Sequence, residues 1–418
     1  MSFQGVVFKS FLSSVLALLA ALPAAAQPAG APANLGEAYA AAWARLPEAR
    51  SLELRRDAAA ARRQIANAWT AEAPALELSG KTDQLNRNQG SREYVAGISL
   101  PLWLPGERDR FGALADAEAQ AIDSRLLAAQ LRIAAAIRES WWSWQRARGL
   151  SAVAGERLGN ARRIAVDVAR RVKAGDLARA DQHQAEGAVA AAEAALAEAE
   201  GAVAVAAEQL RGLIGVAPAI QAAERAERLP VLPVDFNSLD RTHPAVAELL
   251  DRAEVARRSA ELAAAQKRAN PELVLATTRD RGTFADPYSQ TITAGVRIPL
   301  SSEVRHRAKV SAARAEAAEL DAQLLIERER VLAGLSAARI RILTAQKQLD
   351  AAATRARLAR ETRGFFEKSF RLGESDLPTR LRIELEAVEA ERQTALTRTD
   401  LAAAISELRQ ALGLLPEQ

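Results

Sequence analysis

The sequence "AGISLPLWLPG", residues 96–106, decides the fold, because a strand pattern ends within it and a long run of helix-forming residues follows immediately. A similar sequence, "AGVRIPL", residues 294–300, precedes a second such run. Proline has no N–H to donate to a strand ladder or a helix interior, so it ends each strand and turns the chain. Long helices are therefore predicted at Glu107–Lys173 and Glu303–Leu372. The prolines at these strand-to-helix exits are Pro101, Pro105 and Pro299.

Both sequences belong to an internal duplication that covers most of the chain. Matching residues recur in the two halves at nearly constant separations of about 198 positions, as expected for a repeated structural unit. Two repeats are therefore predicted, at residues 27–215 and 241–418, joined by a proline-bearing linker at residues 216–240. The matching pairs are Pro47 and Pro244, Pro74 and Pro271, Gly97 and Gly295, Pro101 and Pro299, Gly175 and Gly373, Leu210 and Leu408, and Gly215 and Gly413.

The N-terminus predicts export from the cytoplasm. Lys9 precedes the apolar run Phe11–Leu22, and three alanines then supply a cleavage site that ends at Ala26. This is the pattern of a secretory signal peptide, here residues 1–26. The alternative is an N-terminal membrane anchor, for which the apolar run is short.

The composition argues against several classes of function. The sequence has no cysteine, which excludes disulfides, thiolate metal sites and cysteine nucleophiles. Its net charge of +4 comes without a long basic run, which disfavours nucleic-acid binding. His183, His243 and His306 are scattered, and no metalloprotease, hydrolase or phosphate-loop motif is present. No enzyme activity, cofactor or metal site is therefore predicted.

The remainder of each repeat is predicted to be helical. A first helix is expected at Leu35–Thr70 and its counterpart at Leu239–Arg268. After each long helix, a glycine turn leads into a returning helix that ends near Gly212 or Leu412. Apolar residues alternate steps of three and four, which is the seam pattern of a left-handed coiled coil. The seam residues are Val189, Ala192, Leu196, Ala199, Val203, Ala206, Leu210 and Leu213, and then Val331, Leu335, Ala338, Ile342, Ala345, Leu349 and Ala352.

Four tryptophans mark different surroundings. Trp141, Trp142 and Trp144 lie about 50 Å from the start of the long helix by helix rise, too far for an aromatic belt at a membrane interface. They are predicted to pack where neighbouring helices meet. Trp103 stands at a strand end and is the better candidate for the interface.

Alternation of apolar and polar residues predicts four amphipathic strands. One face is apolar, while the other carries charges such as Glu77 and Lys81. The strand lengths match the roughly 9–11 residues of a membrane-spanning barrel strand, yet four strands cannot close a barrel. A dimer would supply about eight strands and a trimer about twelve. The alternative is two hairpins on a soluble helical body. The expected strands are Ala75–Asp83, Tyr94–Trp103, Glu272–Asp280 and Ser289–Leu300.

This doubled arrangement of two strands and a long helix resembles the TolC-like outer-membrane efflux proteins. "LPLWLPGERDR" and "RLGESDLPTRL" are most similar to the heavy-metal (cobalt–zinc–cadmium) efflux branch of that family. The resemblance covers nearly the whole chain after the signal peptide. It implies a mainly α fold with a small transmembrane β-barrel, in which a trimer forms a 12-stranded barrel, an α-helical coiled-coil tunnel and an equatorial belt that holds the linker. It also implies the outer membrane of a Gram-negative bacterium, with a large periplasmic part.

The function implied by the resemblance is that of a passive exit duct in a tripartite RND-type efflux pump, with heavy-metal cations as the expected substrate. The implied partners are two further copies of the chain, a periplasmic adaptor (membrane fusion protein), an inner-membrane RND transporter and outer-membrane lipid. Multidrug efflux and type I secretion ducts are alternatives with the same body. A soluble periplasmic coiled-coil adaptor or scaffold is an alternative from another class, and it leaves the amphipathic strands unexplained.

The same resemblance places the adaptor contacts at two hairpin tips, within "VKAGDLARAD" and "FRLGESDLPT". The tip residues are Gly175, Leu177, Gly373 and Leu377. A tight reversal between helices needs a residue with positive φ, so the glycines also have a simple turn-forming interpretation. Basic residues beside the turns are candidates for docking charge, namely Arg171, Lys173, Lys368 and Arg371.

The family also narrows its tunnel near the tips, where TolC carries a ring of acidic residues. The corresponding positions after Gly373 are Thr379 and Arg382 here, so that acidic pattern is not kept. In the first repeat, Asp181 follows Gly175 by six positions and is the candidate for a periplasmic gate. Its alternative is a solvated carboxylate on a helix face.

Overall fold

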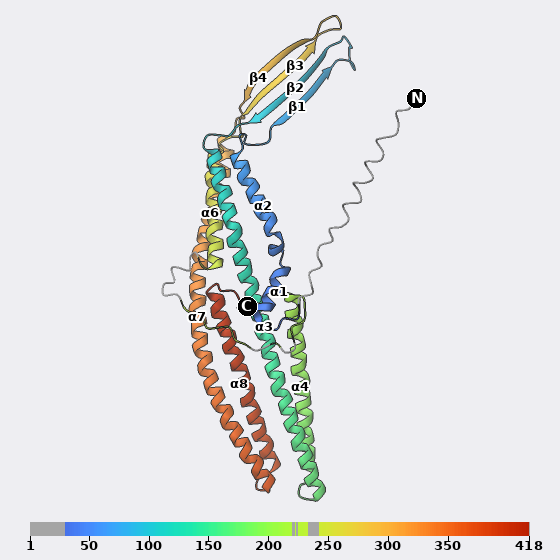
Figure 1. Cartoon of the computed structure of the whole chain (residues 1–418), viewed down its shortest axis with the longest axis vertical. Helices are drawn as coiled ribbons and strands as arrows, with labels where there is room; N and C mark the ends of the chain where they lie inside the picture. Colours follow the sequence, from blue (N-terminus) through green and yellow to red (C-terminus); the bar gives the residue numbers. More distant parts are fainter. Residues whose placement is uncertain (1–29, 220–221, 223–224, 233–241, 418) are drawn as a thin grey trace, which may run out of the picture.

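The computed structural model describes residues 30–219, 222, 225–232 and 242–417. The predicted signal peptide, residues 1–26, lies outside the described residues, as does part of the predicted linker, residues 216–240. Figure 1 shows an elongated molecule with a small β-sheet at one end and two helical hairpins at the other. The two ends of the molecule thus carry different kinds of structure.

Each half of the chain contains a strand hairpin followed directly by a helix of 68 or 70 residues. The fold is mainly helical with a small antiparallel sheet, as predicted. The first half contains α1 (Leu35–Arg45), α2 (Pro47–Asn67), β1 (Ala75–Thr82), β2 (Arg92–Pro101), α3 (Glu107–Ala174) and α4 (Arg179–Ile214). The second half contains α6 (Pro244–Ala265), β3 (Glu272–Arg281), β4 (Ser289–Arg297), α7 (Glu303–Leu372) and α8 (Leu377–Ala411).

The prediction of one continuous helix at Leu35–Thr70 is wrong, because two helices occupy this stretch. The chain leaves the helical conformation at Leu46, where φ is −68° and ψ is 139°, and α2 starts at Pro47. Proline forces the residue before it out of the helical region, and its ring would clash inside a helix. At the first position of a helix its missing N–H costs nothing, so Pro47 begins α2.

α6 also begins at a proline, so the predicted start at Leu239 differs from the observed one. Pro244 is the first helical residue and His243 precedes it as the cap, while Leu239 lies outside the described residues. The His243 side chain is buried, and its Nδ1 has no hydrogen-bond partner among the described residues. Burial without a charged partner lowers the pKa of the His243 imidazole below its usual value.

The sheet has the order β1-β2-β3-β4, and all neighbouring strands are antiparallel. The two halves of the chain meet in the β2–β3 ladder, which runs from the Arg92–Arg281 pair to the Pro101–Glu272 pair. β2 starts two residues before the prediction, and β4 ends at Arg297, ahead of Pro299. The structure thus joins the two duplicated hairpins into one sheet.

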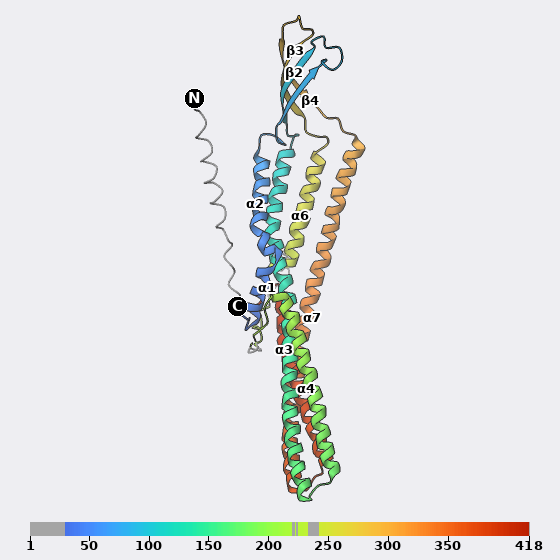
Figure 2. The same cartoon turned by 90° about the vertical axis from the view of Figure 1, so that its right-hand side faces the viewer.

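Two coiled-coil hairpins form the opposite end of the molecule. α3 pairs with α4 and α7 pairs with α8, and Figure 2 shows both hairpins running to the same end. The predicted seams lie inside these pairs: Ala192 and Leu210 are buried in the first, and Leu335 and Ala338 in the second. Alanines at the seam let the axes of the two helices approach closely, so each hairpin stays in contact along its length.

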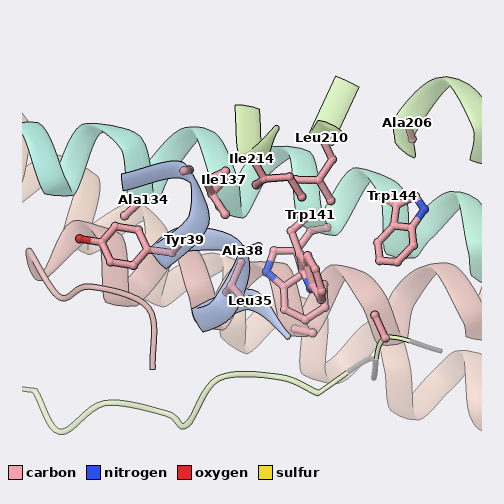
Figure 3. Packing of buried hydrophobic residues seen from close by; sticks show 14 residues of the cluster. Leu35, Ala38, Tyr39, Ala134, Ile137, Trp141, Trp144, Ala206, Leu210 and Ile214 are labelled. Atoms are coloured by element: carbon pink, nitrogen blue, oxygen red, sulfur yellow. The ribbon is translucent and has the colours of Figure 1, made fainter. Parts of the chain in front are cut away.

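The largest apolar core lies at mid-height, where α1, α3 and α4 meet (Figure 3). Trp141, Trp142 and Trp144 are all buried there, which confirms the prediction that they pack between helices. The rings of Trp141 and Trp144 meet edge to face with centroids 5.4 Å apart. Trp142 reaches α8, where its indole N–H donates to the Ser406 hydroxyl at 2.8 Å.

A buried ion-pair network surrounds this core. Glu227, in the predicted linker, lies 2.9 Å from Arg138 of α3 and 3.1 Å from Arg409 of α8. Arg138 also donates to the side-chain oxygen of Gln410 and to the carbonyl of Leu414. Charges taken out of water need pairing with opposite charges, so the network fixes the linker segment against helices from both halves of the chain.

None of the helices within the described ranges combines the length and apolarity needed to cross a membrane.

Candidate functional site: the sheet and the hairpin tips

The sheet has one apolar and one polar face. Residues directly opposite each other in an antiparallel pair point to the same side, so the register assigns every side chain to a face. The apolar face carries Leu76, Leu78, Tyr94, Ile98, Leu100, Leu273, Leu275, Ile292 and Val296. The polar face carries Glu77, Lys81, Glu93, Glu272, Thr278, Asp280 and Arg297.

The apolar face is uncovered in the single chain. Leu76 is 72% exposed and Ile292 is 76% exposed, although both are large aliphatic residues. Figures 1 and 2 show the sheet standing beyond the ends of the helices. A contiguous exposed apolar face of this kind marks contact with lipid or with another protein.

The sheet also has two open edges, because β1 and β4 each pair on one side only. An edge strand presents a row of unpaired N–H and C=O groups and is a template for pairing with another chain. Glu77 and Lys81 on β1 point to the polar face. The single chain thus offers two edges that further copies can complete.

The strand-to-helix exits hold the sheet on the helical body. Pro101 is the last residue of β2, and its carbonyl accepts a hydrogen bond from the Ala71 N–H at 3.0 Å. Pro105 precedes Gly106, whose φ of +73° makes the turn into α3. Pro299 lies in the corresponding connection between β4 and α7. Pro101 therefore ends its strand, while Pro105 and Pro299 lie between a strand and the following long helix.

Trp103 and Glu107 form further hydrogen bonds inside the connection between the sheet and the helices. The Trp103 indole donates to the carbonyl of Ala68 at 3.1 Å, so its polar group is engaged inside the molecule. The carboxylate of Glu107 is buried and accepts from the side chains of Gln266 at 2.7 Å and Asn270 at 2.6 Å. Glu107 ties the start of α3 to the end of α6. No local sequence pattern indicates this role of Glu107, because its partners lie far along the chain.

The two hairpin tips have the same local geometry. Gly175 (φ +87°) follows α3 and Gly373 (φ +79°) follows α7, and each N–H caps the end of its helix. Left-handed backbone of this kind favours glycine and allows an immediate reversal of the chain. Both predicted tip glycines are therefore placed at the ends of the long helices.

The leucines predicted at the tips point inward. Leu377 is only 1% exposed and packs with Phe370 and Val168, and the half-buried Leu177 lies beside the same cluster. The exposed apolar residue at the second tip is Leu372, at 75%. The sequence analysis did not identify Leu372. A single residue at the end of a helix has no periodic pattern that shows whether its side chain is buried or exposed.

Arg171 connects the two tips instead of standing free. Its guanidinium donates to the carbonyls of Phe370 at 2.8 Å and Arg371 at 3.2 Å, and it lies 4.8 Å from the centre of the Phe370 ring. A cation near the end of α7 also interacts favourably with the helix dipole. This residue of the predicted docking charge thus holds α3 against α7.

Asp181 caps the start of α4. Its carboxylate accepts a hydrogen bond from the Ala178 N–H at 3.0 Å, one turn earlier in the chain. A carboxylate at this position satisfies a free N–H and complements the positive end of the helix. The predicted gate residue thus has a local structural role in the single chain.

A charged cavity of about 280 Å³ lies just above the tips, between α3, α7 and α8. Arg380 is buried there, 3.7 Å from Glu367, and Arg363 is 3.5 Å from Glu384. Burial lowers the pKa of the Arg380 guanidinium, and the neighbouring carboxylates oppose that shift. Glu384 also accepts from Asn160 of α3 at 2.7 Å, so the cluster spans both hairpins. The sequence did not reveal it, because its members come from three distant helices.

The described part of the chain brings together no group of three or more histidine, aspartate or glutamate side chains that could hold a metal ion. The cations and carboxylates above are mostly paired with one another. The chemistry they support is therefore electrostatic and structural.

Residues 38–216 match the model of a family described as outer membrane efflux protein, and no curated protein sequence matches the chain. The solved outer membrane protein VceC of Vibrio cholerae is 17% identical with a TM-score of 0.71, over 91% of this chain and 96% of that one. The open-state MtrE outer membrane channel of Neisseria gonorrhoeae is 15% identical with a TM-score of 0.72, over 92% and 90%. CusC, described for its transmembrane channel formation, is 19% identical with a TM-score of 0.70, over 91% and 92%.

These findings define the class of protein. Over almost its whole length the chain has the fold of the TolC-like outer-membrane channels, which confirms the predicted fold class. Its first half matches the outer membrane efflux protein family, whose members are channels and not enzymes. The fold and the family match of the first half therefore agree with the predicted class, an outer-membrane channel of Gram-negative type with a large helical periplasmic part.

Proposed function

We propose that this protein is the exit duct of a tripartite RND-type efflux pump and that it conducts heavy-metal cations passively to the exterior. The observation that carries the proposal is the division of the molecule into an uncovered amphipathic sheet at one end and two hairpin tips at the other (Figure 1). A duct of this kind needs one end that crosses the membrane and another end that binds the periplasmic partner from which it receives substrate.

The membrane-crossing part is a barrel shared by three copies of the chain. Pairing β1 of one copy with β4 of the next satisfies both open edges, as a bilayer requires of every backbone polar group. Three sheets of four strands give a barrel of about twelve strands. A dimer would give a barrel of about eight strands, and the interior of such a barrel is filled by side chains. The apolar face then contacts lipid, and the polar face lines the water-filled interior.

The periplasmic part ends in the tips that receive the adaptor. Gly175 and Gly373 provide the reversals, and Leu177 and Leu377 support them from within the tip cluster. The exposed Leu372 and the basic residues Lys173 and Lys368 supply the surface that the adaptor contacts.

The narrow entrance is formed near these tips. Asp181 is placed one turn above the first tip, where three copies around a threefold axis would form an acidic ring. The cluster around Arg380 and Glu384 holds the two hairpins of each chain together at a similar height. Loosening those ion pairs would allow the hairpins to move apart.

Heavy-metal cations are proposed as cargo from the similarity of "LPLWLPGERDR" and "RLGESDLPTRL" to the heavy-metal efflux branch. Selection then takes place in the transporter and the adaptor, because the described residues of the duct hold no metal-binding cluster. Multidrug efflux and type I secretion remain the competing cargo assignments.

Membrane fractionation of expressing cells, followed by sizing of the detergent-extracted protein, tests the duct. Recovery from the outer membrane as an SDS-sensitive trimer is expected. Replacing Thr291 and Thr293 of the edge strand β4 by proline removes two backbone N–H groups from that strand, and it should abolish the trimer, while replacing the same two residues by serine leaves it intact. Recovery as a periplasmic monomer would refute the barrel and the duct together.

The cargo is tested by complementation of a strain that lacks the chain. Restored resistance to zinc, cobalt and cadmium salts, without a change in resistance to dyes and antibiotics, is the expected result. Restored resistance to antibiotics alone would overturn the metal assignment and leave the duct in place.

A further inference from the structure

Three arginines lie together on the apolar face of the sheet, at the end that carries the hairpin loops. Arg92 and Arg281 are direct cross-strand partners in the β2–β3 ladder, and Arg279 stands opposite Tyr94. The register places all three on the side that carries Leu275 and Ile98. Like charges directly opposite each other destabilise an antiparallel pair. An anion bound between these side chains would remove that repulsion.

Aromatic rings, and not carboxylates, hold two of these arginines, Arg279 and Arg281. The guanidinium groups of Arg279 and Arg281 each lie 4.8 Å from the centre of the Tyr288 ring, and Arg281 lies 5.3 Å from that of Phe284. Arg281 also donates its Nε–H to the carbonyl of Gly90 at 3.1 Å. Stacking fixes a guanidinium in place and leaves its outer N–H groups free to bind an anion.

The nearby carboxylates are engaged elsewhere. Glu93 and Asp280 are adjacent in sequence to the arginines, so their side chains project from the opposite face of the sheet. There Glu93 lies 3.8 Å from a lysine of β1, and Asp280 accepts from the Ser289 hydroxyl at 2.7 Å. Asp286 in the β3–β4 loop accepts hydrogen bonds within its own turn. Within the described ranges, no carboxylate lies at ion-pair distance from the three arginines.

A shallow hollow of about 570 Å³ adjoins Arg279. Tyr94 and Arg279 border it, and its lining includes the small residues Gly80, Ala96 and Thr277. The three arginines lie on the central strands β2 and β3, and the hollow extends over residues of all four strands of the one sheet. The hollow is therefore a feature of each single sheet.

We propose that the surface formed by Arg92, Arg279, Arg281 and this hollow binds the phosphate-bearing headgroup of an outer-leaflet glycolipid of the outer membrane. The proposal rests on the barrel of the proposed function, in which the hairpin loops emerge at the outer leaflet. Arginine forks match phosphate oxygens in a bidentate manner. Tyrosine at this level suits the membrane interface, and the leucines farther from the loops contact acyl chains.

Binding of defined lipids to the detergent-extracted, full-length oligomer, measured by native mass spectrometry, tests the proposal. The variant is Arg92→Gln with Arg279→Gln, which spares Arg281 because that residue also holds the Gly90 loop. The matched control is Lys81→Gln with Arg297→Gln, which removes the same charge from the opposite face. The probes are diphosphorylated lipid A, its dephosphorylated form and inorganic phosphate.

The arginine variant is expected to bind diphosphorylated lipid A at least about tenfold more weakly, which corresponds to the loss of one charge-assisted hydrogen bond. The control is expected to bind as the unmodified protein does, and dephosphorylated lipid should bind weakly to all three. Equal binding by both variants, no preference for the phosphorylated lipid, or binding of inorganic phosphate alone would each overturn the site. Absence of a detergent-extracted trimer would overturn the barrel as well, so the two failures are distinguishable.

Discussion

Helices α3 and α7 hold equivalent places in the two repeats and have nearly equal lengths, yet their surroundings differ. α3 packs against α1, α2, α4, α6 and α8 and carries the buried tryptophans, whereas α7 packs chiefly against α6 and α8. Large apolar side chains on α7 stay in the open, with Phe365 at 67% and Leu343 at 66% exposed. One duplicated unit has thus become an internal helix and a peripheral helix whose apolar surface is available to a second copy of the chain.

The largest effect should come from truncating an aromatic residue on the internal helix. Trp141→Ala is expected to lower the free energy of unfolding by about 4 kcal/mol, because it leaves a cavity in the mid-height core. Phe365→Ala on α7 is the matched change and should alter the unfolding of the single chain by less than about 0.5 kcal/mol. Denaturant titration of both variants measures the difference, and sizing in detergent shows whether Phe365→Ala weakens the trimer. Equal destabilisation would contradict the division into internal and peripheral helices.

The next effect concerns the ion-pair network that only the internal helix possesses. Glu227→Gln leaves Arg138 buried without its counter-charge and removes one of the two carboxylates beside Arg409, which keeps Glu417 at 2.9 Å; it should cost about 3 kcal/mol of stability. Glu407→Gln removes a carboxylate that pairs with Arg341 of α7 at an exposed site and serves as the control, with an expected cost below about 1 kcal/mol. Thermal unfolding of both variants is the measurement. A small effect of Glu227→Gln would show that water or movement compensates the buried arginines.

A smaller effect tests the one place where the two repeats are alike. Gly175→Ala and Gly373→Ala should each destabilise the chain by about 1 kcal/mol, because alanine is strained at positive φ. An added Cβ would meet no atom within 4 Å at either position, so the backbone alone sets the cost. Chemical unfolding of the two variants should give the same shift. Clearly unequal shifts would show that the tips are not equivalent.

The smallest effect is a pH dependence at the start of α6, which packs against both α3 and α7. Burial lowers the pKa of His243 in the folded chain, so the unfolded chain binds the proton more readily. Stability contributed by neutral His243 is therefore present above the ordinary histidine value of about 6.5 and declines as the pH falls below it. His243→Gln should flatten the stability profile between pH 7 and pH 5, measured by thermal unfolding. Persistence of the full pH dependence in that variant would assign it to other groups.

Much of the fold was predictable because its signals are local. The alternation of apolar and polar residues predicted four strands within a few residues of β1 to β4, and the steps of three and four predicted seams that include the buried Ala192 and Leu335. The prediction of a single helix at Leu35–Thr70 was wrong at Pro47, where a new helix begins. The helix-forming residues on both sides of this proline had favoured one continuous helix. That break was in principle visible, since proline restricts the residue before it.

The candidate site was predicted less completely. The tip glycines and exit prolines were found because each residue type has a backbone conformation that its position demands. Leu377, predicted as a tip residue that contacts the adaptor, has its side chain buried against Phe370. The clusters around Arg380 and Glu107 were missed, because each joins residues that are far apart in the chain.

The sequence by itself determined the duplication, the long helices, the strands and their turns, because periodicity and backbone restriction act over a few residues. Only the tertiary structure decided that α3 lies inside and α7 outside, that Arg171 joins the two tips, and that Arg138, Glu227 and Arg409 form one network. Those features depend on contacts between helices that are far apart in the chain. Packing and the need to pair buried charges decide these contacts, and no local sequence pattern records them.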